Sequence, residues 1–364
     1  MRRTLTAIKK GSRYLYEILR TRPPRLIYVS GAHGYPDKNL GDEALFEAYK
    51  VLFKKCSFVH YPGGRVLSIP SKILRFSGYA MLAGGTLINR WGLAAFQECA
   101  DIFSRLFVFG TGVASPIFWL GKSGWKDNMK EWKCVLEKCD YVGVRGPLSA
   151  ELLVNAGMAN VEVIGDPVMV FAAETCPDRN SYEANSIGLN IGQSLENVWG
   201  CEDSICAEYV RLATLARDKG WKVSWFVVWP NDLSATEKAA NLSGTADHIY
   251  KIYEDYRSYL ELVKQVSVFV GMKLHSVVLA TCAYVPSIML EYRPKCLDYM
   301  MSIGQQQDTI RTVKFRAEEV WDRVISKHAS RDELSETLYR SIKPIRDKQL
   351  LKVEELMKRF TLRR

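Results

Sequence analysis

Short apolar runs alternate with longer amphipathic segments along the first half of this chain. The runs have the length of buried strands, and they lie at 26–29, 79–82, 105–109, 140–145 and 161–164. The segments between them repeat apolar residues every three to four positions, which is typical of helices, at 42–54, 93–102, 125–138 and 147–156. This βα order predicts a mainly parallel sheet with helices on both faces.

A polar, turn-rich stretch at 174–186 separates this series from a second one. The second series has predicted strands at 187–191, 222–229, 267–270 and 286–291, and predicted helices at 204–219, 255–264 and 276–283. The tail at 331–364 reads as one amphipathic helix. We therefore expect an α/β fold of two Rossmann-like, doubly wound domains that face a cleft. The expected boundaries are 25–173 for the N-terminal domain, 187–305 for the C-terminal domain and 306–364 for the C-terminal helices.

The first 24 residues are basic and are predicted to be helical as far as Pro23-Pro24, where a helix must stop. Two interpretations stay open for this segment. Its cationic face suits an anionic lipid surface, but its apolar stripe is broken at Gly11, as in an ordinary docking helix or a frayed end.

Size and charge narrow the class of protein. The 364 residues exceed what one hydrophobic core usually supports, which favours two domains. The formal charge of +10 favours a polyanionic partner such as a nucleic acid, an anionic membrane or a phosphorylated substrate. The basic residues are spread through both halves rather than gathered in one patch with aromatics. We therefore expect no nucleic-acid partner.

Cysteines and hydropathy indicate the compartment. The nine cysteines form no C-x-x-C pair, which favours reduced thiols in a cytosol-like environment over a zinc or dithiol site. No apolar run reaches the roughly 18 residues of a membrane span. We expect a cytoplasmic protein, with a peripheral contact at the inner face of the membrane as a further option, and we predict neither a metal site nor a cofactor.

The most informative stretch runs from Gly271 to Ser276. Lys273 and His275 lie directly after an apolar run, and a new helix begins at Ser276. They are therefore predicted at the carboxyl end of a strand, where α/β sheets bind ligands and where a helix N-terminus attracts anions. This position suits an anionic substrate.

Three other strand ends carry candidate chemistry, each with a simpler structural alternative. Asp42, in the segment that begins at Asn39, would be a helix N-cap or a group that moves a substrate proton. Gly84 and Gly85 would allow close approach of a ligand or only a tight turn. Arg145 would be a surface group or a bidentate grip on a carboxylate or phosphate.

Taken together, these pieces resemble the polysaccharide pyruvyl transferase family over roughly residues 26 to 305. The matching pieces occur in the family's order: the N-x-G-D-E-A segment at 39–44, Gly84-Gly85-Thr86-Leu87, the segment 142–149, Gly165-Asp166-Pro167, Met272-Lys273-Leu274-His275 and the segment 286–295. Two positions depart from the pattern. Ala83 replaces the first of three glycines, and Lys273 replaces an arginine, which keeps the charge but loses the planar fork.

The resemblance implies a GT-B-like architecture and an enzyme that transfers pyruvate from phosphoenolpyruvate onto two hydroxyls of a sugar as a ketal. It implies Asp42 and His275 as catalytic residues. The substrate-binding residues that it implies are Arg145, Lys273, Asn39, Gly84, Gly85 and Lys295. The implied acceptor is a sugar on a polyprenyl-diphosphate carrier or a growing surface polysaccharide. The alternatives are a GT-B glycosyltransferase that uses a nucleotide sugar and a basic nucleic-acid-binding protein.

Overall fold

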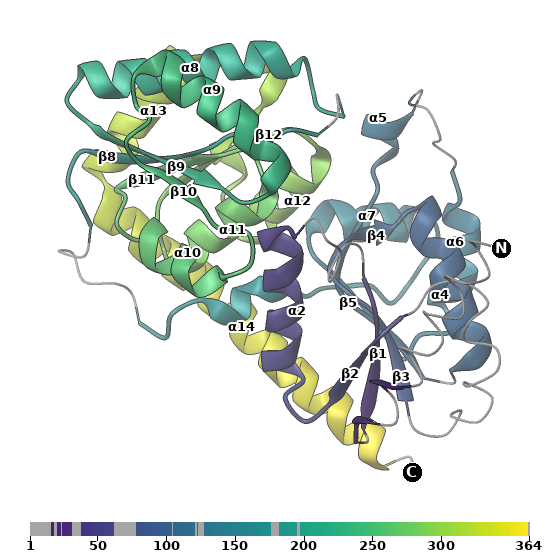
Figure 1. Cartoon of the computed structure of the whole chain (residues 1–364). Helices are drawn as coiled ribbons and strands as arrows, with labels where there is room; N and C mark the ends of the chain where they lie inside the picture. The colour runs from purple at the N-terminus through teal and green to yellow at the C-terminus, as the bar shows by residue number, and fades with distance from the viewer. Residues whose placement is uncertain are drawn as a thin grey trace. The chain divides into compact units, whose positions relative to one another are not determined.

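The computed structural model describes residues 16–17, 20–22, 24–30, 38–61, 78–103, 105–120, 122, 127–175, 182–194 and 197–362. The protein is α/β and divides into two compact units (Figure 1). The first unit comprises Met1–Gly31 and Tyr49–Pro167, and the second comprises Ala32–Ala48 and Val168–Arg364. Each unit has its own sheet, in which the strands pair in parallel.

The first sheet has the order β2-β1-β3-β5-β6-β7, with β4 paired to β5. Its strands are β1 (Arg25–Val29), β2 (Ser57–His60), β3 (Gly78–Leu82), β4 (Gly85–Ile88), β5 (Leu106–Val113), β6 (Tyr141–Val144) and β7 (Glu162–Val163). Every residue of β5 is buried, as expected for a central strand of a parallel sheet that is covered on both faces.

The helices of this part of the chain are α2 (Leu40–Leu52), α4 (Arg90–Ile102), the short α5 (Pro116–Trp119), α6 (Met129–Leu136) and α7 (Pro147–Asn155). Local sequence sets where they begin. The side chain of Asn89 caps α4 by accepting hydrogen bonds from the N–H groups of Trp91 and Gly92. Proline occupies the first position of α7, where no N–H is needed.

The second sheet has the order β10-β9-β8-β11-β12-β13. Its strands are β8 (Ser186–Asn190), β9 (Lys222–Val227), β10 (Ile249–Lys251), β11 (Val268–Gly271), β12 (Ser287–Glu291) and β13 (Thr309–Arg311). Counted along the chain this is the order 3-2-1-4-5-6 of the Rossmann fold. Its topological switch point therefore lies between β8 and β11, where a ligand crevice is expected at the carboxyl ends of the strands.

The helices of the second unit are α8 (Glu202–Asp218), α9 (Leu233–Ser243), α10 (Tyr256–Val263), α11 (Leu274–Cys282), α12 (Pro294–Ser302), α13 (Ala317–Ala329) and α14 (Arg331–Leu362). Helix α11 is apolar on nearly all sides, and eight of its nine residues are buried. Such a helix is held firmly in the core, so the residues at its first turn are well positioned.

The structure confirms the βα alternation and differs in detail. The helix expected at 125–138 is shorter, at α6, and the strand expected at 105–109 extends to Val113 as β5. The predictions did not include the strands β2, β4, β10 and β13 or the helices α5, α9, α12 and α13 as separate elements. Strand β13 lies in the segment 306–364, which was expected to contain only helices. The helix expected at 1–22 lies almost wholly outside the described residues.

The two units also divide the chain differently from the expected boundaries. Residues 32–48, which the sequence places in the first domain, group with the second unit, as do residues from Val168 onward. One physical reason is the N–H of Leu40, which donates a hydrogen bond to the carbonyl of Val228 at the end of β9 (2.9 Å). The C-terminal residues also belong to the second unit, because β13 pairs with β12.

Within the described residues, no helix is both long enough and apolar enough to cross a membrane.

Candidate active site

The switch point of the second sheet is organised by a buried asparagine, Asn190, at the end of β8. Its side-chain amide donates to the carbonyl of Phe226 (2.8 Å). Its Oδ1 accepts hydrogen bonds from the N–H of Lys273 (2.9 Å) and the hydroxyl of Ser276 (2.8 Å). Asn190 therefore fixes the turn between β11 and α11 that carries Lys273 and His275. Sequence reasoning missed it, because a lone asparagine at the end of a strand has no distinctive pattern.

A pocket of about 290 Å³ opens beside this turn. It is lined by Asn39, Gln193, Ser194, Asn197, Val228, Trp229, Lys273, Leu274, His275, Tyr292, Arg293 and Lys295. All of these residues belong to the second unit. They come from the ends of β8, β9, β11 and β12 and from the residue that precedes α2, so the pocket occupies the crevice that the strand order predicts.

The electrostatics of this pocket favour an anion. Lys273, Arg293 and Lys295 line it, and its lining in the described part of the chain includes no carboxylate. Helices α2, α11 and α12 begin at Leu40, Leu274 and Pro294, next to or among these lining residues. Each helix start adds unpaired N–H groups and a partial positive charge.

Lys273 is a partly internal charge. Its Nζ lies 3.1 Å from Oδ1 of Asp232 and donates to the carbonyl of Gln193 (2.5 Å). It also lies 4.5 Å from the centre of the Trp229 ring. Only 9% of Lys273 is exposed. Lys273 therefore stabilises the turn at Gln193 through this hydrogen bond, and its positive charge also lies at the pocket wall.

Asp232 stabilises the same turn from a fully buried position. Its Oδ1 also accepts the N–H of Gln193 (2.8 Å). Burial raises the pKa of Asp232 to about 6, although Lys273 and the hydrogen bonds act in the opposite direction. No local pattern in the sequence distinguishes Asp232 as a site residue.

Asp42 and His275 are neighbours at the start of α2. A Cβ atom on Gly41 would lie 2.2 Å from Nδ1 of His275, so the imidazole packs directly against the Gly41 backbone. Burial raises the pKa of Asp42, while the nearby charges of His275 and Lys295 oppose the rise. Asp42 lies inside the first turn and does not cap the helix.

Asn39 is the residue that caps α2. Its Oδ1 accepts the N–H of Gly41 (2.8 Å), and its carbonyl accepts the N–H of Asp42 (3.0 Å). Because Asn39 also lines the pocket, the cap places an amide side chain at the pocket wall.

Arg293 also lines the pocket, although the sequence does not single it out as a site residue. Its Nε donates to the carbonyl of Asn197 (2.8 Å), and its guanidinium lies 5.2 Å from the centre of the Tyr292 ring. The Nζ of Lys295 lies 5.0 Å from the same ring. Tyr292 thus serves as an aromatic platform that holds two cations at the pocket.

In the first unit, Arg145 follows β6 and is almost completely buried, with 1% of its surface exposed. Its guanidinium donates to the carbonyl of Gly85 (3.3 Å) and to the hydroxyl of Thr86 (3.4 Å). It also lies 3.9 Å from Oδ2 of Asp166, which is itself fully buried. Asp166 is therefore the anionic half of a buried ion pair.

The glycines that follow β3 form the backbone turn that Arg145 contacts. Gly85 has a φ of +105°, a conformation that other residues rarely adopt. It begins β4 and pairs with Thr111. Gly84 is buried beside it. Tight backbone geometry thus accounts for Gly85 without any ligand.

The predicted site residues therefore form two groups. Asn39, Asp42, Lys273, His275 and Lys295 come together in the second unit, at or beside the pocket. Arg145, Gly84 and Gly85 come together in the first unit.

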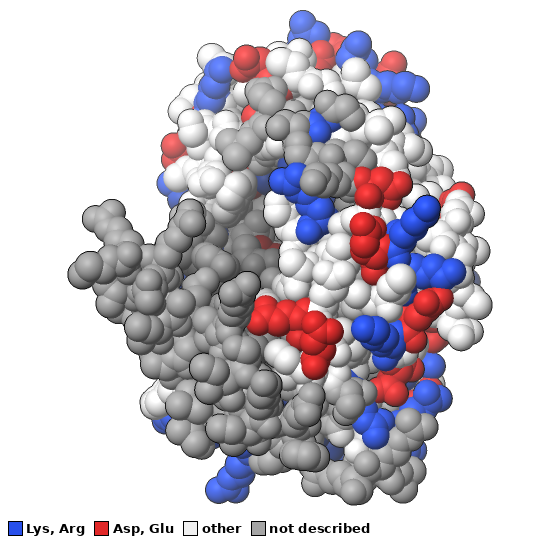
Figure 2. All heavy atoms as spheres, turned by 90° about the vertical axis from the view of Figure 1, so that its right-hand side faces the viewer, with Lys and Arg blue, Asp and Glu red and all other residues white. Residues whose placement is uncertain are grey.

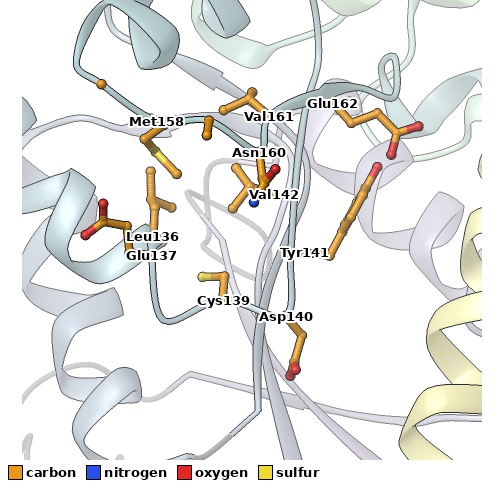
Figure 3. Close-up of a pocket in the computed structure, with 12 residues that line it drawn as sticks. Leu136, Glu137, Cys139, Asp140, Tyr141, Val142, Met158, Asn160, Val161 and Glu162 are labelled. Atoms are coloured by element: carbon orange, nitrogen blue, oxygen red, sulfur yellow. The ribbon is translucent and has the colours of Figure 1, made fainter.

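A second pocket, of about 610 Å³, lies in the first unit at the amino ends of β6 and β7 (Figure 3). This is the edge of the sheet opposite to the one that Arg145 follows. Its lining includes the carboxylates of Glu137, Asp140 and Glu162, and the side chains of Tyr141 and Glu162 lie beside each other in Figure 3. An anionic ligand would be repelled here, so the smaller pocket of the second unit is the better candidate.

Fold and pocket together define a GT-B-like α/β protein with a crevice lined by basic side chains. Among solved structures, UDP-GlcNAc 2-epimerase from Neisseria meningitidis, bound to UDP-GlcNAc, has a TM-score of 0.53 at 11% identity and covers 92% of this chain and 100% of its own. The MnaA–UDP complex from S. aureus has a TM-score of 0.55 at 13% identity and covers 92% and 94%. At such identities the likeness shows the fold alone.

The sequence itself identifies the family. The family model described as polysaccharide pyruvyl transferase matches residues 39–294, which is most of the chain and includes Asn39, Arg145 and His275. The protein belongs to the polysaccharide pyruvyl transferase family. No curated protein matches it in sequence.

Proposed function

We propose that this protein transfers the pyruvyl group of phosphoenolpyruvate onto two hydroxyls of a sugar, forming a ketal in a polysaccharide precursor. The observation that carries the proposal is the pocket of the second unit. Three cations and the starts of three helices meet there in a member of the pyruvyl transferase family. Phosphoenolpyruvate is small and carries a phosphate and a carboxylate, so it needs several positive groups in one place.

In this proposal the pocket of the second unit binds the donor. Lys273, Lys295 and Arg293 contribute charge, and the helix starts contribute N–H groups. The amide of Asn39 adds a neutral polar contact at the wall. Within the first unit, Arg145 holds Gly85 and Thr86 in place. Gly85, which is partly exposed, then offers its backbone to a substrate, whereas Gly84 is buried and shapes the turn beside it.

The reaction balances without a cofactor. A proton is added to the methylene carbon of the donor, which becomes a methyl group and leaves the central carbon electrophilic. One sugar hydroxyl adds to that carbon and loses its proton. The second hydroxyl then displaces phosphate, the bond between the central carbon and the phosphate oxygen breaks, and the ketal ring closes. Of the two hydroxyl protons released, one replaces the proton consumed and the other leaves with phosphate.

We propose that Asp42 and His275 move these protons. A raised pKa keeps the carboxyl of Asp42 protonated at higher pH than an ordinary aspartate, as a general acid for the methylene carbon requires. His275, packed on Gly41, would then stabilise the departing phosphate or take up a hydroxyl proton. We propose this division of roles because burial raises the pKa of Asp42.

The proposed acceptor is a sugar carried on a polyprenyl diphosphate. Its own negative charge matches the positive charge of the protein, which is +10 over the whole chain.

A nucleic-acid partner is less suited. On the face that Figure 2 shows, the described Lys and Arg residues are interspersed with Asp and Glu, whereas nucleic-acid binding uses a continuous basic patch. Among the described residues, no cluster of three or more His, Cys, Asp or Glu could hold a metal ion.

The test is mass spectrometry of lipid-linked sugars after incubation with the protein and phosphoenolpyruvate. The expected result is a mass gain equal to a pyruvate ketal with release of one phosphate per ketal. Release of phosphate without a mass gain, or no reaction with any diol-bearing sugar, would contradict the proposal.

A second candidate is a glycosyltransferase that uses a nucleotide sugar. It draws support from the two similar folds, whose structures contain UDP-GlcNAc and UDP. The candidates differ in which ligand protects the pocket. We expect phosphoenolpyruvate to slow hydrogen exchange at the first turn of α11, whereas protection by UDP alone would favour the alternative.

A further inference from the structure

The first unit displays an unusual group of exposed apolar side chains on α4 and α5. Ile117 is 76% exposed, Leu120 is 75% exposed and Trp91 is 60% exposed. The ring of Trp91 meets that of Trp119 edge to face, with centroids 6.4 Å apart, so the two helices present one continuous patch. We call Trp91, Ile117, Trp119 and Leu120 the α4–α5 patch.

This patch is held rigidly from below. Phe118, between the exposed residues of α5, is buried and anchors the short helix to the unit. On α4, the Asn89 cap binds the N–H groups of Trp91 and Gly92, and the indole of Trp132 donates to the carbonyl of Asn89 (2.9 Å). In Figure 1, α5 stands out from the rest of its own unit. The apolar side chains are thus displayed on a fixed support.

Two cations border the same patch. The guanidinium of Arg90 lies 4.7 Å from the centre of the Trp91 ring, and Nζ of Lys122 lies 3.9 Å from that of Phe118. Between Gly85 and Lys122 the only acidic residues are Glu98 and Asp101, two or more turns along α4 from Trp91. Aliphatic tips, tryptophans and cations in this combination match the layers of an anionic bilayer surface, where tryptophan prefers the interface and cations meet the headgroups.

We propose that the α4–α5 patch docks the protein on anionic phospholipid. A second copy of the chain is the other occupant to consider. A stable protein interface uses roughly 20–30 residues on each side, and four side chains are far fewer. A bilayer needs no such area, because a few apolar side chains plus nearby cations suffice for reversible binding. Charge complementarity therefore selects the membrane.

The location gives the docking a use. Helices α4 and α5 follow β4 and β5, so the patch lies at the carboxyl edge of the first sheet, the edge that Arg145 also follows. A lipid-linked acceptor would be delivered to this edge, and that step alone rests on the proposed function. Docking itself is measured without donor or acceptor, so its failure would leave the transferase proposal standing.

The experiment compares full-length proteins for flotation with vesicles of phosphatidylcholine, with and without phosphatidylglycerol. Ile117→Glu/Leu120→Glu is the test variant. Leu242→Glu/Leu351→Glu is its matched control, because these leucines are 66% and 67% exposed in the second unit. The N-terminal basic segment is the same in every protein, so differences report on the substituted residues.

We expect the parent and the control to float with phosphatidylglycerol vesicles, and the test variant to bind them at least about tenfold more weakly. Thermal melting of each variant shows whether the fold is intact. Equal flotation of the test variant and the parent would overturn the proposal, as would a parent that floats with neither vesicle. A parent that is dimeric by analytical ultracentrifugation, becomes monomeric in the test variant and does not float would assign the patch to a second copy instead.

Discussion

Arg145 in the first unit and Lys273 in the second are basic residues in similar local settings, but their charged groups make different contacts. Both follow a strand of a parallel sheet. A Cβ on Gly112 would lie 2.3 Å from Nη2 of Arg145, and a Cβ on Gly192 would lie 2.4 Å from Cε of Lys273. In each unit the absence of a side chain at a glycine therefore leaves space for the basic side chain.

Arg145 and Lys273 each have a fully buried aspartate as a partner, but their remaining contacts differ. Arg145 reaches Asp166 and donates to Gly85 and Thr86, so its guanidinium is used inside the protein. Lys273 reaches Asp232 but also lines an open pocket. A basic residue at a strand end is thus easy to locate from sequence, while the direction in which its charge acts depends on contacts that only the fold creates.

The largest expected effect is on the chemistry of the second unit. His275→Ala should lower ketal transfer by at least about 100-fold, because the imidazole is proposed to assist phosphate departure or proton transfer. The melting temperature should change little, since His275 lies at the edge of the core. Initial rates of phosphate release measure the effect. His248→Ala is the matched control, and retention of near-parental rates by His275→Ala would remove this residue from the mechanism.

The next effect is on the stability of the first unit. Arg145→Ala should lower the free energy of unfolding by about 3 kcal/mol, because it leaves Asp166 buried without its cation. Arg105→Ala is the control, since the Arg105–Asp140 pair is partly exposed and should contribute less than about 1 kcal/mol. Urea unfolding followed by circular dichroism measures both. A variant at Arg145 as stable as the parent but unable to bind phosphoenolpyruvate would show instead that the arginine touches the donor.

The sequence predicts the positions of Arg145 and Lys273 but not the aspartates that pair with them. The period and length of the apolar segments predict the two βα series, and both basic residues follow an apolar run. The aspartates that complete the two pairs lie on other strand ends, far along the chain. Nothing local distinguishes Asp232 from any other aspartate before a helix, so its pairing could not be predicted.

The missed elements have similar causes. Strand β4 begins at Gly85 with a positive φ, so its first residues resemble a turn. Strand β10 has only three residues, too few to show a period of two. Asn190 acts through its side-chain hydrogen bonds to Lys273 and Ser276, which arise only when β8 and β11 pair.

The buried aspartate of the second unit should make stability depend on pH. The folded-state pKa of Asp232 is raised to about 6 from an ordinary 3.8, so the folded protein holds this proton more tightly than the unfolded chain. The resulting stabilisation is complete below the ordinary value and is lost as pH rises through about 6. Relative to Asp232→Asn, which cannot titrate, the parent should therefore lose about 2 kcal/mol between pH 4 and pH 7.

Urea unfolding of both proteins across this pH range measures the difference. Asp218→Asn serves as the control because its carboxylate is exposed and paired only at the surface. A gap between parent and Asp232→Asn that stays constant with pH would mean that the Lys273 pair keeps Asp232 ionised throughout, and the two buried pairs would then be alike in this respect.

The smallest effect tests the two glycines directly. In Gly192→Ala the new methyl group would collide with Lys273, so the ammonium must move away from the turn at Gln193. We expect affinity for phosphoenolpyruvate to fall about tenfold, equivalent to about 1.4 kcal/mol, as measured by calorimetry. In Gly112→Ala the methyl group would collide with Arg145, which should lower the melting temperature instead. Gly78→Ala is the control, because a Cβ there first meets Phe103 at an ordinary 3.5 Å. If both variants lost affinity, or both lost stability, Arg145 and Lys273 would have the same role. The proposed difference, a structural Arg145 and a ligand-binding Lys273, would then be wrong.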